Sequence, residues 1–508
     1  MSNAQDAANR GPITVSIMLA TVMNSLDTTI ANVALPHIQG SVSASQEQIT
    51  WVLTSYIISA AIMTPLSGWL AGRIGRKRLF LISIAGFTVA SMLCGIANSL
   101  LEIVGYRLLQ GLFGAALIPL SQAILLDINP PEKHGQAMAV WGMGALLGPI
   151  LGPALGGWLT ENLDWRWVFF INLPIGILAF LGVWFFTSHD GKSTARPFDF
   201  VGFGALIAFI GAVQMMLDRG PSLDWFDAGE IQIYAIIAAM GLWVFITHTM
   251  TATHPFFDRA LVRDRNFMTS CIFGFFIGIL LFSTMALTPP MMQTLMGYPV
   301  LTAGLVSMPR GFGSFAAMFV VGRLIGKIDT RIILFTGLCL NAVALWQMMQ
   351  FDLSMNSTPF IISGIIQGFG IGMIFVPLST LAFATVAPHL RAEGSSVYTL
   401  IRNLGAAVGI SIMQALMIAN TQTMHESMAG RVNLSDPAVA SAMAGRLDLS
   451  TQAGLSALNG EITRQATMVA YIDDFQLMLI LTLLCIPMLL LMRQPKRKAP
   501  GPVHVEAD

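Results

Sequence analysis

Long apolar runs separated by short polar segments make up most of the chain. A helix that crosses a bilayer needs about 20 consecutive, mostly apolar residues. Fourteen runs meet this need, and they lie at 13–35, 49–71, 79–98, 102–126, 137–159, 167–187, 200–217, 231–250, 268–289, 302–325, 332–351, 359–385, 394–419 and 473–492. The pattern predicts an all-α membrane protein with fourteen spans.

The composition agrees with a chain that is covered by lipid. Hydrophobic residues make up 55% of the 508 residues and charged residues 11%, whereas soluble domains carry roughly 25% charged residues. Membrane lipid is therefore an expected partner. The 27 basic and 27 acidic residues balance, which argues against a nucleic-acid partner, because binding to phosphates needs a basic excess.

The basic residues are distributed unevenly between the two sets of loops. Loops on the side of the N-terminus hold nineteen of the 27 Lys and Arg, the opposite loops hold five, and Arg107, Arg310 and Arg402 lie inside spans. Since cytoplasmic loops carry the excess of positive charge, both termini are expected in the cytoplasm and the chain in a bacterial inner (plasma) membrane.

Two parts of the chain repeat each other in the same direction. Residues 70–75 resemble residues 324–329, and Gln110-Gly111 followed by Pro119-Leu120-Ser121 recurs as Gln367-Gly368 followed by Pro377-Leu378-Ser379. Parallel halves with a site between them are a transporter architecture. The predicted order is a cytoplasmic N-terminus (1–12), a six-helix bundle (13–187), two inserted spans with linkers (188–267), a second six-helix bundle (268–492) that includes the periplasmic loop 420–471, and a cytoplasmic C-terminus (493–508).

Several segments resemble one known family. The loop 68–78 resembles the cytoplasmic signature loop of the major facilitator superfamily, with the matching residues Gly68, Arg73, Gly75, Arg76 and Lys77. Residues 107–111 resemble its fourth-span motif, and residues 26–36 resemble the first-span motif of its fourteen-span drug:proton antiporters. A glycine ladder resembles the fifth-span motif of its antiporters and comprises Gly144, Gly148, Pro149, Gly152, Pro153, Gly156 and Gly157.

Within this superfamily the chain looks closest to the EmrB-type multidrug exporters. The resemblance implies a major facilitator fold and export of hydrophobic or amphipathic compounds in exchange for protons, by alternating access. It also implies a periplasmic EmrA-like adaptor and an outer-membrane channel as candidate partners. One residue departs from the family: Gly72 stands where the signature loop normally has an acid, and this puts the usual charge latch between the halves in doubt.

Other functions have less support in the sequence. A dedicated exporter of a single metabolite, lipid or siderophore on the same fold is the main alternative. The chain has no Walker-type phosphate loop and no catalytic constellation, and its eight His lack the spacing of metal ligands. We therefore expect neither an enzyme nor a metal or cofactor, and the proton gradient is the expected energy source.

Asp27 is the sharpest candidate for chemistry. It lies nine residues from Pro36 at the outer end of its run, which is roughly 13 Å at 1.5 Å per residue. A charge at such a depth costs at least about 2.5 kcal/mol. Asp27 is therefore either the carrier of the coupling proton or half of a fixed ion pair that packs helices.

Arg107 and Gln110 are the expected companions of Asp27. Arg107 lies in the same outward half of the membrane, and Gln110 follows three residues later on the same helical face. The pair with Arg107 either breaks and re-forms during transport or is a permanent bridge. Gln110 either extends the polar relay, touches substrate or packs against a helix.

Three further features remain open between a functional and a structural role. Arg310 and Arg402 lie roughly 12–13 Å from opposite membrane faces and either contact substrate or stabilise helix ends. The glycine ladder makes a groove that serves as a gate between the halves or as a static packing seam. The segment 420–471 is a solvated loop, a set of short amphipathic helices or a docking surface for a periplasmic partner.

Overall fold

The computed structural model describes residues 9–49, 51–187, 197–431 and 451–492. Predictions for the basic residues of the 188–196 linker and of the C-terminus at 493–508 lie outside the described residues. The described chain forms helices and no strand. Fourteen of these helices are long and apolar enough to cross a membrane, which confirms the predicted fold class and the number of spans.

The first six spans form one bundle. Its helices are α2 (Arg10–Ser41), α4 (Trp51–Ile74), α5 (Arg76–Ile96), α6 (Leu100–Gly114) with α7 (Leu117–Ile128), α8 (His134–Asn162), and α9 (Trp167–Phe170) with α10 (Asn172–Phe186). A short helix, α3 (Gln46–Ile49), precedes α4. The fourth span is one run in the sequence, but it is divided into α6 and α7 at Ala115 and Ala116.

The two inserted spans are α11 (Phe200–Arg219) and α12 (Gly229–Thr251). The end of α11 is bonded to both bundles: Asp218 accepts a hydrogen bond from Thr54 at 3.1 Å, and the Leu217 carbonyl accepts one from Ser411 at 2.7 Å. The helix α12 packs on α11 and exposes large apolar side chains such as Met240 and Trp243. An apolar outer face of this kind suits contact with lipid.

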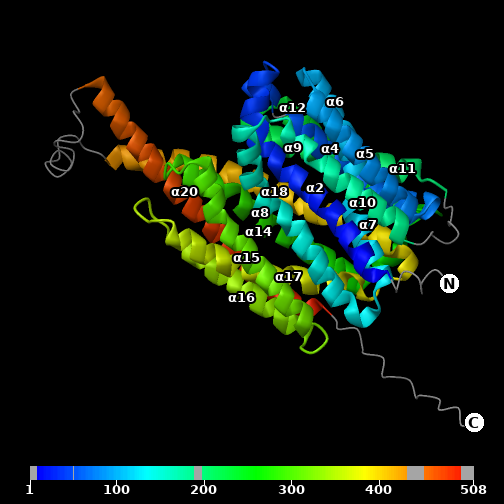
Figure 1. Cartoon of the computed structure of the whole chain (residues 1–508). Helices are drawn as coiled ribbons and strands as arrows, with labels where there is room; N and C mark the ends of the chain where they lie inside the picture. The colour runs from blue at the N-terminus through cyan, green and yellow to red at the C-terminus, as the bar shows by residue number, and fades with distance from the viewer. Residues whose placement is uncertain (1–8, 50, 188–196, 432–450, 493–508) are drawn as a thin grey trace, which may run out of the picture.

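The last six spans form the second bundle. Its helices are α14 (Arg265–Thr294), α15 (Val300–Leu324), α16 (Thr330–Met348), α17 (Thr358–Ala384), α18 (Arg391–Arg431) and α20 (Gln452–Met488), with the short α13 (Arg259–Arg263) before them. The helices α18 and α20 are much longer than the predicted spans 394–419 and 473–492. The described parts of 420–471 therefore continue the two flanking helices, and the outer part of α20, in orange, projects beyond its neighbours in Figure 1.

The start of α2 and the end of α7 lie at one end of the molecule, which we call the basic end. Arg10 donates a hydrogen bond to the Ile128 carbonyl at 2.8 Å there. The two bundles also join at this end, where the hydroxyls of Ser67 and Ser396 lie 2.8 Å apart. Arg76 and Arg391 also bond across the two bundles near the basic end, as do Gln122 and Ser395. The structure is therefore a conformation that is closed at the basic end.

Candidate functional site

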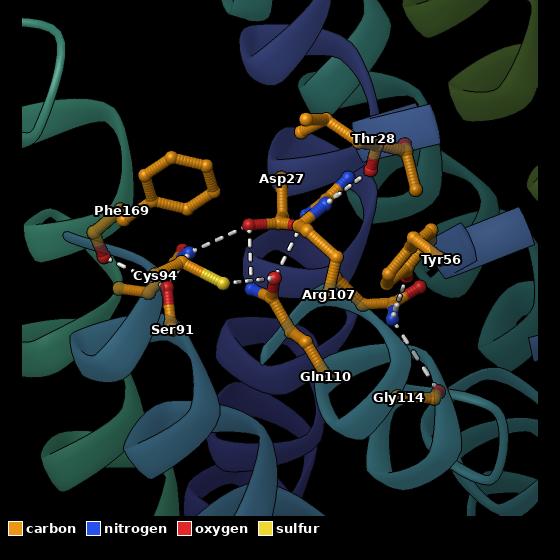
Figure 2. A network of polar contacts seen from close by, with 12 residues as sticks. Asp27, Thr28, Tyr56, Ser91, Cys94, Arg107, Gln110, Gly114 and Phe169 are labelled. Atoms are coloured by element: carbon orange, nitrogen blue, oxygen red, sulfur yellow. Dashed lines mark hydrogen bonds and ion pairs between the residues drawn. The ribbon is translucent and has the colours of Figure 1, made fainter. Parts of the chain in front are cut away.

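Asp27 lies at the centre of a buried polar network inside the first bundle (Figure 2). The Arg107 Nη1 atom is 2.7 Å from Asp27 Oδ2, and the two side chains are 1% and 0% exposed. Asp27 Oδ1 accepts hydrogen bonds from Gln110 Nε2 at 2.8 Å and from Asn172 Nδ2 at 3.0 Å. The three candidates from the sequence are thus brought together, with one additional amide.

The Arg107 guanidinium is held by more than its carboxylate partner. Its Nε donates to the Val52 carbonyl at 3.1 Å, and its Nη1 also donates to Gln110 Oε1 at 2.7 Å. Its central carbon lies 4.4 Å from the centre of the Tyr56 ring (Figure 2), a distance at which an aromatic face attracts a cation. The cation is therefore shielded from lipid by α2, α4 and α6.

Asn172 is a member of the network that sequence reasoning missed. Its Nδ2 bonds both Asp27 and the Ser91 hydroxyl, the latter at 2.9 Å, and Ser91 donates to the Phe169 carbonyl at 2.9 Å. The available signal was its residue type, because Asn172 is the single amide in the apolar run 167–187. Through Asn172, α10 is tied to the same carboxylate as α6.

The network balances one negative and one positive charge that are both removed from water. Removing one partner of a buried pair typically costs about 3–5 kcal/mol, because the other charge is left uncompensated. Transfer of a proton to Asp27 would have this effect on Arg107. Protonation of Asp27 would therefore weaken the contacts that tie α2 to α6 and α10.

The glycine ladder of α8 packs against α2 beside Asp27. A Cβ atom on Gly148 would lie 2.2 Å from the Ser25 carbonyl carbon, and one on Gly152 would lie 2.1 Å from Thr29 Oγ1. Thr29 donates a hydrogen bond to the Gly148 carbonyl at 3.0 Å. The groove is thus a close contact within the first bundle, whereas the prediction of a gate placed it between the halves.

The remaining ladder residues differ in how tightly they are enclosed. A Cβ atom on Gly144 would meet the Met18 side chain, and one on Gly156 would lie 3.0 Å from Ile30. Gly157 has open space around it, and α8 continues as one helix through Pro149 and Pro153. Another side of α8 packs on α15 of the second bundle, where Ile150 meets Gly311.

The signature loop lies at the basic end and takes part in the contact between the bundles. A Cβ atom on Gly68 would lie 2.7 Å from the Glu393 Cα atom, so α4 and α18 approach closely there. Gly75 has a φ of +92°, which glycine adopts without strain, and it leads into α5. Lys77 donates to the carbonyls of Trp184 and Thr187, and the Arg73 guanidinium lies 5.4 Å from the Trp69 ring centre.

A charge latch is present although the loop lacks its usual acid at position 72. Asp127, at the end of α7, forms an ion pair with Arg76 of the first bundle. The same carboxylate is 2.9 Å from Arg391 Nη1 of the second bundle, and Arg76 also donates to the Pro388 carbonyl at 3.0 Å. Asp127 therefore supplies the negative charge of the latch.

Arg310 and Arg402 lie in the second bundle, on α15 and α18, and both are half-buried. Arg310 packs beside Gly364 and Gly368 of α17, whereas the Arg402 guanidinium lies 5.6 Å from the Phe375 ring centre of the same helix. Among the described residues no acidic side chain pairs with either of them, and Arg402 Nε is buried without a hydrogen-bond partner. These two cations are therefore not neutralised, in contrast to Arg107.

No group of three or more His, Cys, Asp or Glu within the described ranges is arranged to hold a metal ion.

Comparison with known proteins agrees with this architecture. The family model for the Major Facilitator Superfamily matches residues 17–410. The chain is 36% identical to the multidrug export protein EmrB of Haemophilus influenzae, over 84% of each chain. It is also 39% identical to the fatty acid resistance protein FarB of Neisseria gonorrhoeae, over 83% of each chain.

Solved structures share the fold at low sequence identity. The human organic anion transporter MFSD10 superposes with a TM-score of 0.59 at 14% identity, covering 95% of this chain and 100% of that one. The proton:xylose symporter XylE gives a TM-score of 0.58 at 13% identity, covering 95% and 97%. With the fourteen spans and the sequence match over most of its length, the chain belongs to the major facilitator superfamily, among the EmrB-type exporters.

Proposed function

We propose that this protein exports hydrophobic and amphipathic drugs and toxic compounds across the bacterial inner membrane in exchange for protons. Relatives that are named multidrug export proteins match most of its length. The observation that carries the proposal is the Asp27–Arg107 ion pair, which is shielded inside a membrane-spanning bundle. The proton gradient is the energy source in this proposal, which includes no cofactor.

The proposed coupling step is protonation of Asp27. A proton on this carboxyl would remove the charge that compensates Arg107 and weaken the bonds from Gln110 and Asn172. Because Asp27 is fully buried in the conformation closed at the basic end, the proton would reach it only after helices move apart. Substrate and proton would then bind in alternation as the two bundles rock.

The proposed orientation places the basic end in the cytoplasm, together with both termini. The latch residues Arg76 and Arg391 and the neighbouring Arg73 and Lys77 lie at this end, and positive charge accumulates on the cytoplasmic side of membrane proteins. The latch around Asp127 would then close the cavity toward the cytoplasm in the conformation described here.

A periplasmic EmrA-like adaptor, leading to an outer-membrane channel, is the partner we propose. The support is the helical extension of α18 and α20 beyond the span lengths predicted from hydropathy. Figure 1 shows this extension projecting away from the rest of the molecule. Membrane lipid covers the remaining surface, including the apolar face of α12.

A second candidate function is export of one class of anionic lipid or metabolite. Arg310 and Arg402 favour it, because two cations without acidic partners would attract a carboxylate. The relative FarB is named a fatty acid resistance protein. A panel that contains both cationic drugs and fatty acids separates the two candidates.

The test is substrate-induced proton release from energised everted membrane vesicles. The wild-type protein should release protons when several chemically unrelated amphipathic compounds are added. Asp27→Asn should abolish this release while still exchanging substrate down its concentration gradient, which also shows that the variant is folded. Release confined to fatty acids would select the second candidate.

The control is Asp352→Asn, which removes an exposed acid in the loop between α16 and α17. This variant should release protons as the wild type does. Undiminished release by Asp27→Asn would remove Asp27 as the proton carrier, and absence of release with every compound would overturn proton exchange.

A further inference from the structure

The second bundle repeats the polar contact of the first bundle without its charges. Gln367 Nε2 donates to Thr284 Oγ1 at 3.2 Å, as Gln110 donates to Asp27. Thr284 follows Asp27 by 257 residues, and Gln367 follows Gln110 by the same interval. Gly364, at the same interval after Arg107, cannot replace the guanidinium. The position that corresponds to Asp27 therefore holds a neutral hydroxyl.

A carboxyl group nevertheless lies near this position, and it comes from a different helix. The Thr284 hydroxyl contacts the sulfur of Met478 on α20 at 3.5 Å. Asp474 lies one helical turn from Met478, and its side chain is 1% exposed. The last span thus places an acid one helical turn from the residue that contacts the counterpart of Asp27.

Asp474 is buried without a partner. Its Oδ2 atom has no hydrogen bond, and no ion pair reaches its carboxyl group from any described residue. The neighbouring Asp473 is different, because it is half-exposed and accepts a hydrogen bond from Asn420 at 3.4 Å. Asp27 is also different, because three side chains donate to it.

The helices packed against α20 provide no charge at this depth. The helix α14 has no charged side chain after Arg265, α16 has none after Arg331, and α18 has none between Arg402 and His425. The other ionisable groups of α14 and α16 are the thiols Cys271 and Cys339.

On α20 itself the ionisable neighbours also leave Asp474 uncompensated. Tyr471 lies one turn away, and Glu461 and Arg464 pair with each other at 3.1 Å. The distance along the helix from Asp474 to Arg464 is ten residues, or about 15 Å. A negative charge on Asp474 would therefore have no counter-charge within hydrogen-bonding distance.

We propose that Asp474 is a second proton-binding site and that it carries its proton in the conformation closed at the basic end. A buried carboxylate without donors is far more costly than a neutral carboxylic acid in the same place. The two bundles then hold their acids in opposite states: Asp27 is charged and paired, whereas Asp474 is neutral. Movement of α20 away from α14 and α18 would admit water and allow the proton to leave.

The proposal rests on the proposed proton exchange for its role in transport, but the bound proton is detectable without transport. The measurement is the infrared C=O band of protonated carboxylic acids, recorded near neutral pH on the full-length protein in lipid vesicles. The band should be present in the wild type and should be lost in Asp474→Asn, whose side chain has the shape of the protonated acid and preserves the fold. Asp473→Asn is the matched control and should keep the band, as should Asp27→Asn.

The infrared band tests the Asp474 site separately from the proposed proton exchange. An unchanged band in Asp474→Asn would overturn the proposal even if proton exchange is observed. A lost band in a protein that shows no substrate-induced proton release would uphold the site and contradict antiport. If Asp474 holds a proton and the protein also exchanges protons for substrate, Asp474→Asn should release fewer protons per substrate than the wild type. Asp473→Asn should release as many as the wild type. Equal release by Asp474→Asn would remove Asp474 from the transport cycle.

Discussion

Ser67 of α4 and Ser396 of α18 share a hydrogen bond of 2.8 Å across the contact between the two bundles. Both side chains are buried, at 1% and 0% exposure. The residues are 329 positions apart in the chain, so the contact exists only when the bundles are closed at the basic end. The Ser67–Ser396 hydrogen bond is therefore a marker of the closed conformation.

A disulfide between these positions should lock the closed state. In a Ser67→Cys/Ser396→Cys variant the two sulfur atoms would be within bonding reach after small side-chain rotations. Oxidation should abolish transport and a reductant should restore it, as measured by substrate-induced proton release. The half-buried Cys339 is replaced by Ser in all variants to lower the background. Full transport by the oxidised double variant would show that the bundles need not separate here.

Loss of the latch charge should favour opening at the basic end. Asp127→Asn removes the ion pairs with Arg76 and Arg391, which are partly exposed. Each such pair contributes about 0.2–1 kcal/mol, so loss of both pairs should lower the ratio of closed to open molecules by roughly 2- to 30-fold. The measurement is the rate at which a water-soluble maleimide labels Ser396→Cys from the basic end. Asp164→Asn, far from the latch, should leave the rate unchanged, and an equal rate in Asp127→Asn would contradict a latch role.

The Asp27–Arg107 pair should show strong coupling in stability. Arg107→Met and Asp27→Asn each leave one buried charge, and each should lower the unfolding free energy by roughly 3–5 kcal/mol. The double variant Asp27→Asn/Arg107→Met removes both charges and should regain most of this loss. Thermal unfolding midpoints in detergent measure the cycle. If the loss of unfolding free energy in the double variant equalled the sum of the two single losses, the two charges would not compensate each other.

The number of membrane-spanning helices and the centre of the candidate site could be predicted from the sequence because they depend on local patterns. Run lengths predict the fourteen spans, and the spacing of Arg107 and Gln110 places both on one helical face. Their common partner Asp27 is the acid at matching depth in the first span. A charge in lipid is so costly that its partner is strongly constrained.

Contacts between distant segments could not be predicted in this way. The sequence around Asp127 does not indicate that its partner is Arg391, which is 264 residues away. The hydropathy pattern does not single out Asp474, because the apolar run 473–492 starts beside it and so places the acid at the membrane surface. The helix α20 begins instead at Gln452, since its polar outer part folds as helix although it lacks the hydropathy of a span.

The close contact of α8 with α2 should make Gly148 intolerant of any side chain. Gly148→Ala would place its Cβ 2.2 Å from the Ser25 carbonyl carbon of α2, well inside van der Waals contact. Such overpacking typically costs about 1–3 kcal/mol, and it would displace the helix that carries Asp27. Gly157→Ala is the matched control, because nothing lies within 4 Å of its Cβ position. Equal thermal stability and transport in the two variants would mean that the ladder is not a packing seam.

The unpaired guanidinium of Arg402 should favour ligands that carry a negative charge. A charge-assisted hydrogen bond contributes about 1.5–3 kcal/mol, so Arg402→Gln should weaken binding of a saturated fatty acid by roughly 10- to 150-fold. The methyl ester of the same acid has no charge and should lose little affinity. Binding is measured on the purified protein in lipid nanodiscs.

Arg323→Gln provides the comparison for Arg402→Gln. The Arg323 guanidinium lies 3.5 Å from the Phe319 ring centre and donates to a carbonyl of its own helix, so it is already engaged at the surface. Its loss should leave both ligands unaffected. If Arg402→Gln weakened the acid and the ester equally, the side chain would act through packing on Phe375, and the second bundle would have no preference for anions at this position.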